Sequence, residues 1–369
     1  MGQEKLRFGI VGAVGRGSSF VASLQAHAGG ELVAMCDVQA ELLAQRAAEV
    51  GVSQTFADAE AMFDSGAIDA VILGTPMPLH VPHAVLALDR GIHVLSEVPA
   101  GVSVEQCRDL AAAARRSSAR YMLAENYCYN RNVVLVKQMA RAGVFGEMYY
   151  AEGAYLHELK ELNEVTKWRR RWQTGINGNT YCTHSLGPPL QWLAPQRVTA
   201  VCCAGSGHHY RDPRGDQYQQ EDSVVTLCRL TGGGLVSLRL DMLSNRPHNM
   251  GYVALQGTDG CVETARGLGD VPKVWLRGRT EDGQWQPLED YAEEFLPPHW
   301  LNAPAEAQTA GHEGGDYWEL DDFIGAIREG RELEIGIHEA LDMTLPGLAS
   351  QESIAQGGTW VAVGDSRTW

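Results

Sequence analysis

A glycine-rich loop near the start of the chain has the residue types to bind a phosphate. It reads Gly12-Ala-Val-Gly15-Arg-Gly17 and stands between an apolar run and a helical stretch. Such a loop presents main-chain N–H groups and the positive end of a helix dipole to a pyrophosphate. Val14 takes the place of the second glycine in GxGxxG, so the spacing alone would also fit a tight structural turn. Its place after a strand and before a helix favours a dinucleotide.

Asp37 ends the second apolar run, Val33-Ala-Met-Cys-Asp37, about 20 residues beyond the loop as the dinucleotide fingerprint requires. A carboxylate there accepts hydrogen bonds from the ribose hydroxyls and repels a 2′-phosphate. We therefore expect NAD rather than NADP. The same side chain could cap the following helix, alone or in addition.

The second half of the chain holds side chains that can move protons. Tyr155 and His157 lie two apart on the alternating run Met148–His157, so they share one face of a predicted strand. Taken alone, such a pair fits the core or rim of a sheet as well as catalysis. His184, in Tyr181-Cys-Thr-His184, titrates near neutrality and could serve as a base or cap the next helix.

A basic and aromatic cluster, Lys167-Trp-Arg-Arg-Arg-Trp172, lies between these two segments of an otherwise acidic chain. A solvated charged face is one interpretation, and a ligand-binding segment is the other. Arg170 and Arg171 also allow the hypothesis of an anionic sugar, because guanidinium groups suit oxyanions.

Composition limits the classes of protein to consider. The 369 residues suffice for two domains, and 44% hydrophobic with 21% charged residues is typical of globular proteins. A formal net charge of −16 disfavours nucleic acid or an anionic membrane as partner. No apolar run approaches the roughly 20 residues that span a bilayer. The N-terminus has no signal-peptide pattern, so we expect a cytoplasmic protein.

The cysteines and histidines do not indicate a metal site. The eight cysteines include no CxxC pair and no spacing suited to zinc, so we expect reduced structural thiols. The histidines at 80, 83, 208, 209 and 312 bring too few nearby ligands for a stable centre, and we predict no metal.

The elements that must position these residues follow from periodicity. Up to residue 125, short apolar runs alternate with helical stretches, which is typical of a parallel sheet with crossover helices. Beyond it, alternating runs predict a largely antiparallel sheet after a helix at Val133–Ala142. We predict an α/β fold with two domains, a doubly wound parallel sheet at 1–125 and an α+β domain at 126–369. The expected strands are Leu6–Val11, Glu31–Cys36, Ala70–Leu73, His93–Ser96, Tyr121–Ala124, Met148–His157, Thr199–Cys203, Ser223–Arg229, Leu235–Met242 and Gly251–Gln256, and the first-domain helices lie around 17–28, 39–50, 79–90 and 103–117.

Two motifs resemble the Gfo/Idh/MocA oxidoreductase family, in which an N-terminal Rossmann domain binds the nicotinamide cofactor. They are Gly74-Thr-Pro76 with His80, and Gly91-Ile-His-Val-Leu-Ser-Glu97-Val-Pro99. The resemblance implies that Thr75, Pro76 and the Glu97 region line the cofactor site. It also implies a lysine after the glutamate that serves proton transfer in the dehydrogenases. Here that position is Val98, which cannot take a proton.

Glu97-Val-Pro-Ala instead resembles a branch of the family whose members are NAD-dependent glycosidases, glycoside hydrolase family 109 with its α-N-acetylgalactosaminidases. Later stretches are similar to the same branch, so the resemblance covers about residues 6 to 357. They are Glu125-Asn126-Tyr-Cys-Tyr129, Val144-Phe-Gly-Glu147, Glu152-Gly-Ala-Tyr155-Leu-His157, Trp168-Arg169, Asn177-Gly-Asn-Thr-Tyr181-Cys-Thr-His184-Ser-Leu-Gly-Pro188, Gln256-Gly-Thr-Asp-Gly260 and Gly311-His312-Glu-Gly-Gly-Asp316.

The resemblance implies a role for each matching residue. Tyr155 and His184 would be catalytic, and His157, Arg169, Tyr181 and Thr183 would bind substrate. The residues expected to bind cofactor are Gly12, Val14, Gly15, Arg16, Gly17, Asp37, Thr75, Pro76, His80, Glu97, Val98, Asn126 and Trp168.

The activity implied is hydrolysis of a small-molecule glycoside by transient oxidation at C-3, elimination, water addition and re-reduction, in a homo-oligomer. The alternatives are a sugar or inositol dehydrogenase that releases NADH, and a dinucleotide-binding homologue without turnover.

Overall fold

The computed structural model describes residues 4–247 and 249–369, which fall into two compact units. The first unit holds the chain up to Tyr129 together with Pro304–Leu341 and Ser366–Trp369. The second holds Asn130–Ala303 and Asp342–Asp365. Pro304–Leu341, which the division at residue 125 assigns to the second domain, thus belongs to the first unit.

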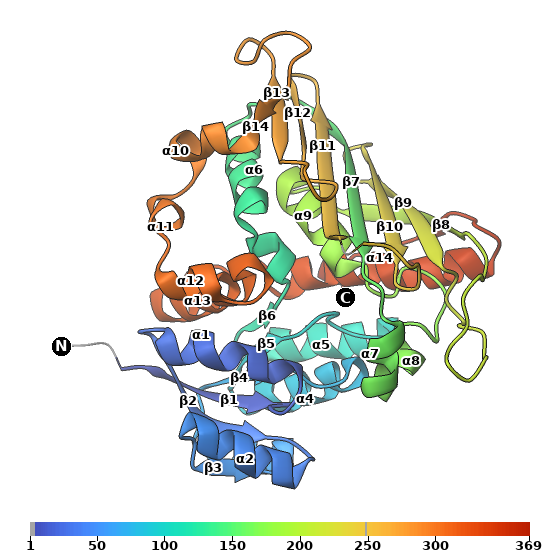
Figure 1. Ribbon diagram of the computed structural model, residues 1–369. Coiled ribbons are helices and arrows are strands. Elements are labelled where there is room, and N and C mark those ends of the chain that lie inside the picture. The colour runs from blue at the N-terminus through green and yellow to red at the C-terminus, as the bar shows by residue number, and fades with distance from the viewer. Residues whose placement is uncertain (1–3, 248) are drawn as a thin grey trace. The chain divides into compact units, whose positions relative to one another are not determined.

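The first unit is built on a six-stranded sheet in the order β3-β2-β1-β4-β5-β6, in which every neighbouring pair is parallel (Figure 1). This confirms the predicted doubly wound Rossmann sheet. Sequence reasoning missed β3 and α3, because elements this short give no clear period. The strands are β1 (Leu6–Val11), β2 (Gly30–Cys36), β3 (Gln54–Phe56), β4 (Ala70–Leu73), β5 (His93–Ser96) and β6 (Tyr121–Leu123).

The strand order of this sheet reverses between β1 and β4. The loops that leave the carboxyl ends of these two strands therefore border the crevice where sheets of this type bind ligands. One buried helix, α13, packs against α1 and η3, and its Phe323 ring meets the Phe8 ring of β1. The helices of this unit are η1 (Arg16–Ser19), α1 (Phe20–Ala26), α2 (Ala40–Val50), α3 (Ala59–Asp64), η2 (Met77–Leu79), α4 (His80–Leu88), α5 (Val104–Arg116), η3 (Asn126–Tyr129), α12 (Ala305–Thr309), η5 (His312–Gly314), α13 (Gly315–Glu329) and η6 (Ser366–Thr368).

The second unit is built on a nine-stranded sheet in the order β14-β13-β12-β11-β7-β10-β9-β8-β15. Only the β7–β10 pair is parallel, which confirms the predicted largely antiparallel sheet. Four strands at its edges, β12 to β15, are too short to give a detectable alternating pattern and were not predicted. The strands are β7 (Met148–Leu156), β8 (Val198–Gly205), β9 (Ser223–Leu230), β10 (Leu235–Asp241), β11 (Asn249–Gly257), β12 (Gly260–Glu263), β13 (Lys273–Leu276), β14 (Gln286–Pro287) and β15 (Val361–Ala362).

One helix, α9, lies against β7, β10 and β11 and buries nearly every side chain it carries (Figure 1). It begins at Thr183, so its first turn presents the Tyr181–His184 segment to β7. The other helices of this unit are α6 (Arg131–Arg141), α7 (Lys160–Val165), α8 (Lys167–Trp172), α9 (Thr183–Leu193), η4 (Leu288–Tyr291), α10 (Ala292–Phe295) and α11 (Pro298–Leu301), and α14 (Ile337–Ala355) contributes residues to both units.

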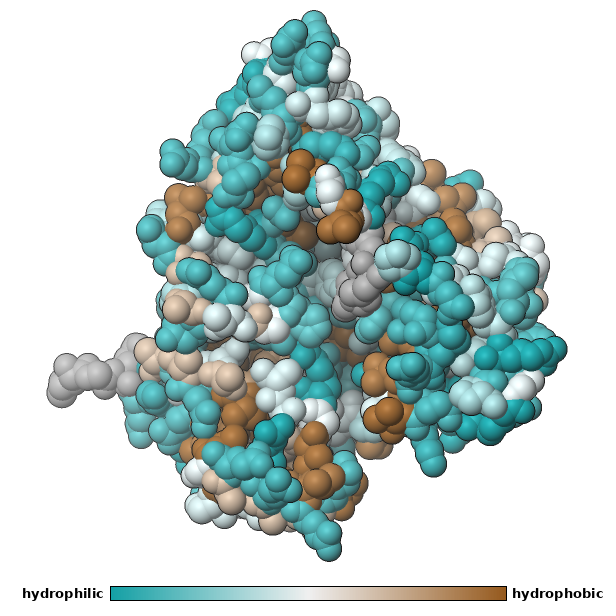
Figure 2. Space-filling view, viewed as in Figure 1, coloured by the Kyte–Doolittle hydropathy of each residue, from teal (hydrophilic) through white to brown (hydrophobic). Residues whose placement is uncertain are grey.

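Hydrophilic residues predominate on the face of the molecule drawn in Figure 2, with single apolar residues scattered among them. Such isolated apolar residues are normal on a protein surface. Within residues 4–247 and 249–369, no helix combines the length and the apolar character that crossing a membrane demands.

Candidate active site

The glycine loop follows β1 and touches the loop that follows β4. Gly12 has a φ of +81°, and a Cβ atom there would lie 2.6 Å from the carbonyl oxygen of Gly74. A Cβ at Gly74 would in turn lie 2.4 Å from the main-chain nitrogen of Gly17. Because only glycine permits this approach, the two backbones form a cradle without side chains, as a bound pyrophosphate requires.

Asp37 follows β2 and joins the glycine loop to the start of α2. Its Oδ2 accepts a hydrogen bond of 3.0 Å from the Val14 N–H, and its Oδ1 accepts one of 3.0 Å from the Gln39 N–H. The second contact stabilises the turn before α2; the N-cap of α2 is Gln39, without a side-chain cap, so Asp37 does not cap this helix. Each carboxylate oxygen can accept a further bond, so capacity remains for ribose hydroxyls.

Two buried polar atoms at this edge of the sheet have no hydrogen-bond partner in the part of the chain that the structure describes. They are Oγ1 of Thr75 and Oδ1 of Asn126. Such atoms cost free energy unless a ligand or water satisfies them. Together with the glycine cradle and Asp37, they fit a bound dinucleotide.

His80, Glu97 and Val98 line the same region from buried positions. The two ring nitrogens of His80 lie 2.9 Å from the carbonyl oxygens of Pro99 and Thr75. Burial lowers the pKa of His80, although both carbonyls oppose the shift. His80 therefore ties together the loops after β4 and β5. Glu97 Oε1 accepts a hydrogen bond of 2.6 Å from Nε of Arg16.

Four rings cluster in the second unit, between the end of β7 and the start of α9. Tyr155 Oη lies 2.8 Å from Nδ1 of His157, as their shared strand face predicts. The His184 ring centroid lies 4.9 Å from that of Tyr155 and 4.8 Å from that of Tyr181. Tyr155 and His184 are buried, whereas His157 and Tyr181 are partly accessible. The sequence segments thus converge on one acid–base cluster.

Arg169 and Trp168 form a second group, on α8. The Arg169 guanidinium stacks 4.6 Å from the Trp168 ring, and its Nη1 donates to Oε1 of Gln173 at 3.0 Å. Nε of Arg169 and Nε2 of Gln173 are buried without a partner among the described residues. These donors suit sugar hydroxyls. Gln173 was missed, although its place four residues after Arg169 on a helical run could have indicated it.

Arg170, the next arginine of this cluster, interacts with other side chains of the protein. Arg170 Nε lies 3.4 Å from Oδ2 of Asp212, and the guanidinium stacks 4.6 Å from the Tyr218 ring. Of the three arginines, Arg171 is exposed, and its guanidinium stacks on the Trp172 ring. Arg170 thus gives no support to the hypothesis of an anionic sugar.

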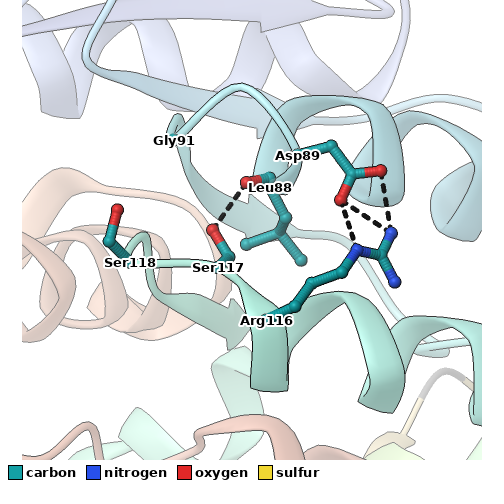
Figure 3. Close-up of a pocket in the computed structure, with 6 residues that line it drawn as sticks. All are labelled: Leu88, Asp89, Gly91, Arg116, Ser117 and Ser118. Atoms are coloured by element: carbon teal, nitrogen blue, oxygen red, sulfur yellow. Dashed lines mark hydrogen bonds and ion pairs between the residues drawn. The ribbon is translucent and has the colours of Figure 1, made fainter.

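The first unit also has a hollow of about 290 Å³, lined by residues that include Leu88, Ser117 and Ser118. Figure 3 shows these residues with Arg116 paired with Asp89. In the described ranges, no group of three or more His, Cys, Asp or Glu side chains could hold a metal ion. Burial raises the pKa of the Cys36 and Cys107 thiols to about 12.

Both parts of the chain match models of known families. Residues 129–368 match the model of the glycosyl hydrolase 109 C-terminal domain, and residues 6–125 match the oxidoreductase family with an NAD-binding Rossmann fold. A glycosyl hydrolase family 109 protein of Saccharopolyspora erythraea is 30% identical over 95% of this chain and 81% of its own length. An α-N-acetylgalactosaminidase of Tannerella forsythia is 27% identical over 96% of this chain and 85% of its own.

Solved structures share the fold. Levoglucosan dehydrogenase in complex with NADH has a TM-score of 0.83 at 21% identity, covering 98% of this chain and 100% of that one. The WlbA dehydrogenase of Bordetella pertussis, solved with NADH and UDP-GlcNAcA, has a TM-score of 0.75 at 22% identity, covering 98% and 99%.

Proposed function

Because this chain belongs to the glycosyl hydrolase 109 family, we infer that it is an NAD-dependent glycoside hydrolase that works through a transient ketone at sugar C-3. The reaction comprises oxidation at C-3, elimination of the aglycone, addition of water and re-reduction. The observation that carries this proposal is the cluster of Tyr155, His157 and His184, in a chain that has Val98 where dehydrogenases of the wider family have lysine.

The cofactor would be held by the cradle of Gly12, Gly17 and Gly74, by Asp37 at the ribose, and by the unpartnered oxygens of Thr75 and Asn126. When bound, NAD supplies the reversible removal of the C-3 hydrogen with its electron pair. Val98 is buried and apolar, so it excludes water from this part of the site rather than moving a proton.

His184 is the base that we assign to the C-3 hydroxyl. Its imidazole would take the hydroxyl proton during oxidation and return it during re-reduction. Its place in the first turn of α9, against the Tyr155 ring, holds the imidazole in a buried position.

Tyr155 is the group that we assign to the C-2 proton, which the neighbouring ketone makes acidic. A neutral phenol can accept that proton only if it releases its own, and Nδ1 of His157 lies 2.8 Å from the phenol oxygen. The phenol proton would pass to His157 as the C-2 proton arrives. The aglycone then leaves with the electron pair of the C-1–O bond, and water adds at C-1 while C-2 regains a proton. The proton roles of Tyr155 and His184 could be exchanged.

The test is incubation with a panel of p-nitrophenyl glycosides that begins with the α-N-acetylgalactosaminide, following aglycone release and absorbance at 340 nm together. We expect aglycone to exceed total NAD many times over without steady NADH. NADH in proportion to product would instead identify a net dehydrogenase. Cofactor binding without any turnover would identify a non-catalytic homologue.

Cytoplasmic location and homo-oligomeric assembly stay predictions of the sequence. Light scattering coupled to size-exclusion chromatography measures the oligomeric state, and a monomer at micromolar concentration would contradict homo-oligomeric assembly.

A further inference from the structure

Asp316 is a fully buried carboxylate at the start of α13, in the segment that returns to the first unit. It accepts hydrogen bonds from Arg16, from Nδ2 of Asn126 at 3.0 Å and from Nδ1 of His312 at 3.0 Å. The contact with Arg16 is bidentate, with Nη2 to Oδ1 at 2.9 Å and Nη1 to Oδ2 at 3.1 Å. Two of these donors, Arg16 and Asn126, are residues that we expect at the cofactor.

The Arg16 guanidinium donates nearly all of its hydrogen bonds to groups of the protein. Of the five N–H donors of a guanidinium, Nε donates to Glu97, Nη1 donates to Ser19 and Asp316, and Nη2 donates to Asp316. Two carboxylates neutralise its charge, and its side chain is about three-quarters buried. The side chain therefore joins the glycine loop to the surrounding structure and is poorly placed to act as a free cation for a pyrophosphate.

The backbone before α13 is shaped to deliver Asp316 to this place. His312, Glu313 and Gly314 have φ values of 54°, 57° and 91°, three consecutive left-handed residues. A residue other than glycine is strained in the left-handed region, and such conformations persist where the surroundings fix them. A Cβ at Gly315 would lie 2.6 Å from the Asn126 carbonyl oxygen, so α13 begins in direct contact with η3.

The charges around the guanidinium are consistent with a fixed, charged pair. Burial alone would raise the pKa of Asp316, but hydrogen bonds from His312 and Arg16 hold that pKa well below its usual range. Burial raises the pKa of the neighbouring Glu319 well above its usual range, and the charges of Asp316 and Glu97 add to this shift. Asp316 thus keeps its negative charge for Arg16 in spite of its burial.

We propose that Asp316 is a positioning residue for the cofactor: it holds the Arg16 guanidinium and the Asn126 amide, and through them the glycine loop and η3. The proposal rests on the NAD site of the proposed function and deepens it. It predicts that Asp316 acts on NAD affinity through Arg16 rather than through the stability of α13.

The experiment measures the NAD dissociation constant by isothermal titration calorimetry, without substrate. The variants are Asp316→Asn, Arg16→Lys and the double variant, each with its apo melting temperature. Asp322→Asn is the matched control, because Asp322 is also buried on α13, pairs with Arg331 at 2.6 Å and accepts a hydrogen bond from Tyr129. It should lower the melting temperature and change the NAD dissociation constant less than about twofold.

We expect Asp316→Asn and Arg16→Lys each to raise the dissociation constant about tenfold or more, as for a lost charge-assisted hydrogen bond. The double variant should be no weaker than the weaker single variant, because both changes remove one interaction. If Arg16→Lys keeps the wild-type NAD affinity, Arg16 acts as a free cation. If the dissociation constant of the double variant rises by the product of the two single effects, the two residues have independent roles. Either result would overturn the proposal, as would an effect of Asp322→Asn equal to that of Asp316→Asn.

Arg16→Lys keeps the test decisive if Asp316→Asn does not fold, because Arg16 is partly exposed at the start of η1. An unchanged NAD affinity in that variant contradicts the proposal by itself. Absence of NAD binding by the wild-type protein would overturn the proposed function as well. Wild-type binding with unaffected variants would overturn this inference alone.

Discussion

The backbones of Gly153 and Ser185 touch: a Cβ atom at Gly153 would lie 1.8 Å from the carbonyl oxygen of Ser185. This contact brings β7 and α9 together two residues before Tyr155 on the strand and one residue after His184 on the helix. The distance between Tyr155 and His184 therefore depends on the absence of a side chain at residue 153.

Gly153→Ala is expected to destabilise the protein and to reduce turnover. A methyl group at this position must push α9 from β7, and overpacking of this kind costs roughly 1–3 kcal/mol. Chemical denaturation measures the loss, and p-nitrophenyl glycoside turnover measures the effect on the cluster. Gly267→Ala is the matched control, because a Cβ at Gly267 would meet no atom within 4 Å. Equal stability of the two variants would contradict the prediction.

Local patterns located most of the longer strands, but not β3, α3 or the four short strands at the edges of the second sheet. The period of two on residues 148–157 placed Tyr155 and His157 on one face, and the structure joins them by a hydrogen bond. The apolar runs located five of the six strands of the first sheet, β3 being the exception, with ends within one residue. Helix Arg131–Arg141 was likewise predicted to within two residues of each end.

The long-range contacts were not accessible in this way. Arg16 and Asp316 are 300 residues apart, and no periodicity indicates that the segment after residue 304 returns to the first unit. The Gly153–Ser185 contact depends on how a strand and a helix pack. Sequence spacing describes neighbours along one element, whereas these contacts arise from tertiary packing.

Asp37→Ala should weaken NAD binding about tenfold, because a charge-assisted contact to the ribose is lost. It should also reduce the preference for NAD over NADP, since the variant has no carboxylate at this position to repel a 2′-phosphate. Fluorescence titration with both cofactors measures the two effects. Asp58→Ala provides the control, because Asp58 caps α3 of the same unit through the Ala61 N–H. Tighter binding of NADP than NAD by the wild-type protein would show the assignment to be wrong.

Glu319→Gln should stabilise the protein relative to wild type by an amount that grows with pH. Below the pKa of an unfolded glutamate, about 4.3, the carboxyl is protonated in both states. Above it, the unfolded chain ionises while burial keeps the folded carboxyl protonated, since its pKa is raised. The wild type therefore loses stability as pH rises toward the folded pKa, and glutamine does not.

Melting temperatures of both proteins between pH 4 and pH 9 measure this difference. Glu329→Gln, an exposed change on the same helix, corrects for the general effect of the substitution. A difference that shrinks as pH rises would refute the protonated state of Glu319.

The final prediction separates the two proton-transfer roles. Without the phenol of Tyr155, C-3 oxidation can still occur but the C-2 proton stays, so Tyr155→Phe should accumulate NADH at up to one equivalent per site. Deuterium entry at C-2 in heavy water should fall on the order of 100-fold.

His184→Ala should instead suppress NADH formation by a similar factor, because the C-3 hydroxyl loses its base. Tyr150→Phe is the control, since Tyr150 lies on the other face of β7 and its hydroxyl bonds Glu152 and Ser237 rather than the ring cluster. Interchanged results would exchange the two roles. Stoichiometric NADH from the wild type with C-2 hydrogen retained would establish a dehydrogenase, because only elimination requires that C–H bond to break.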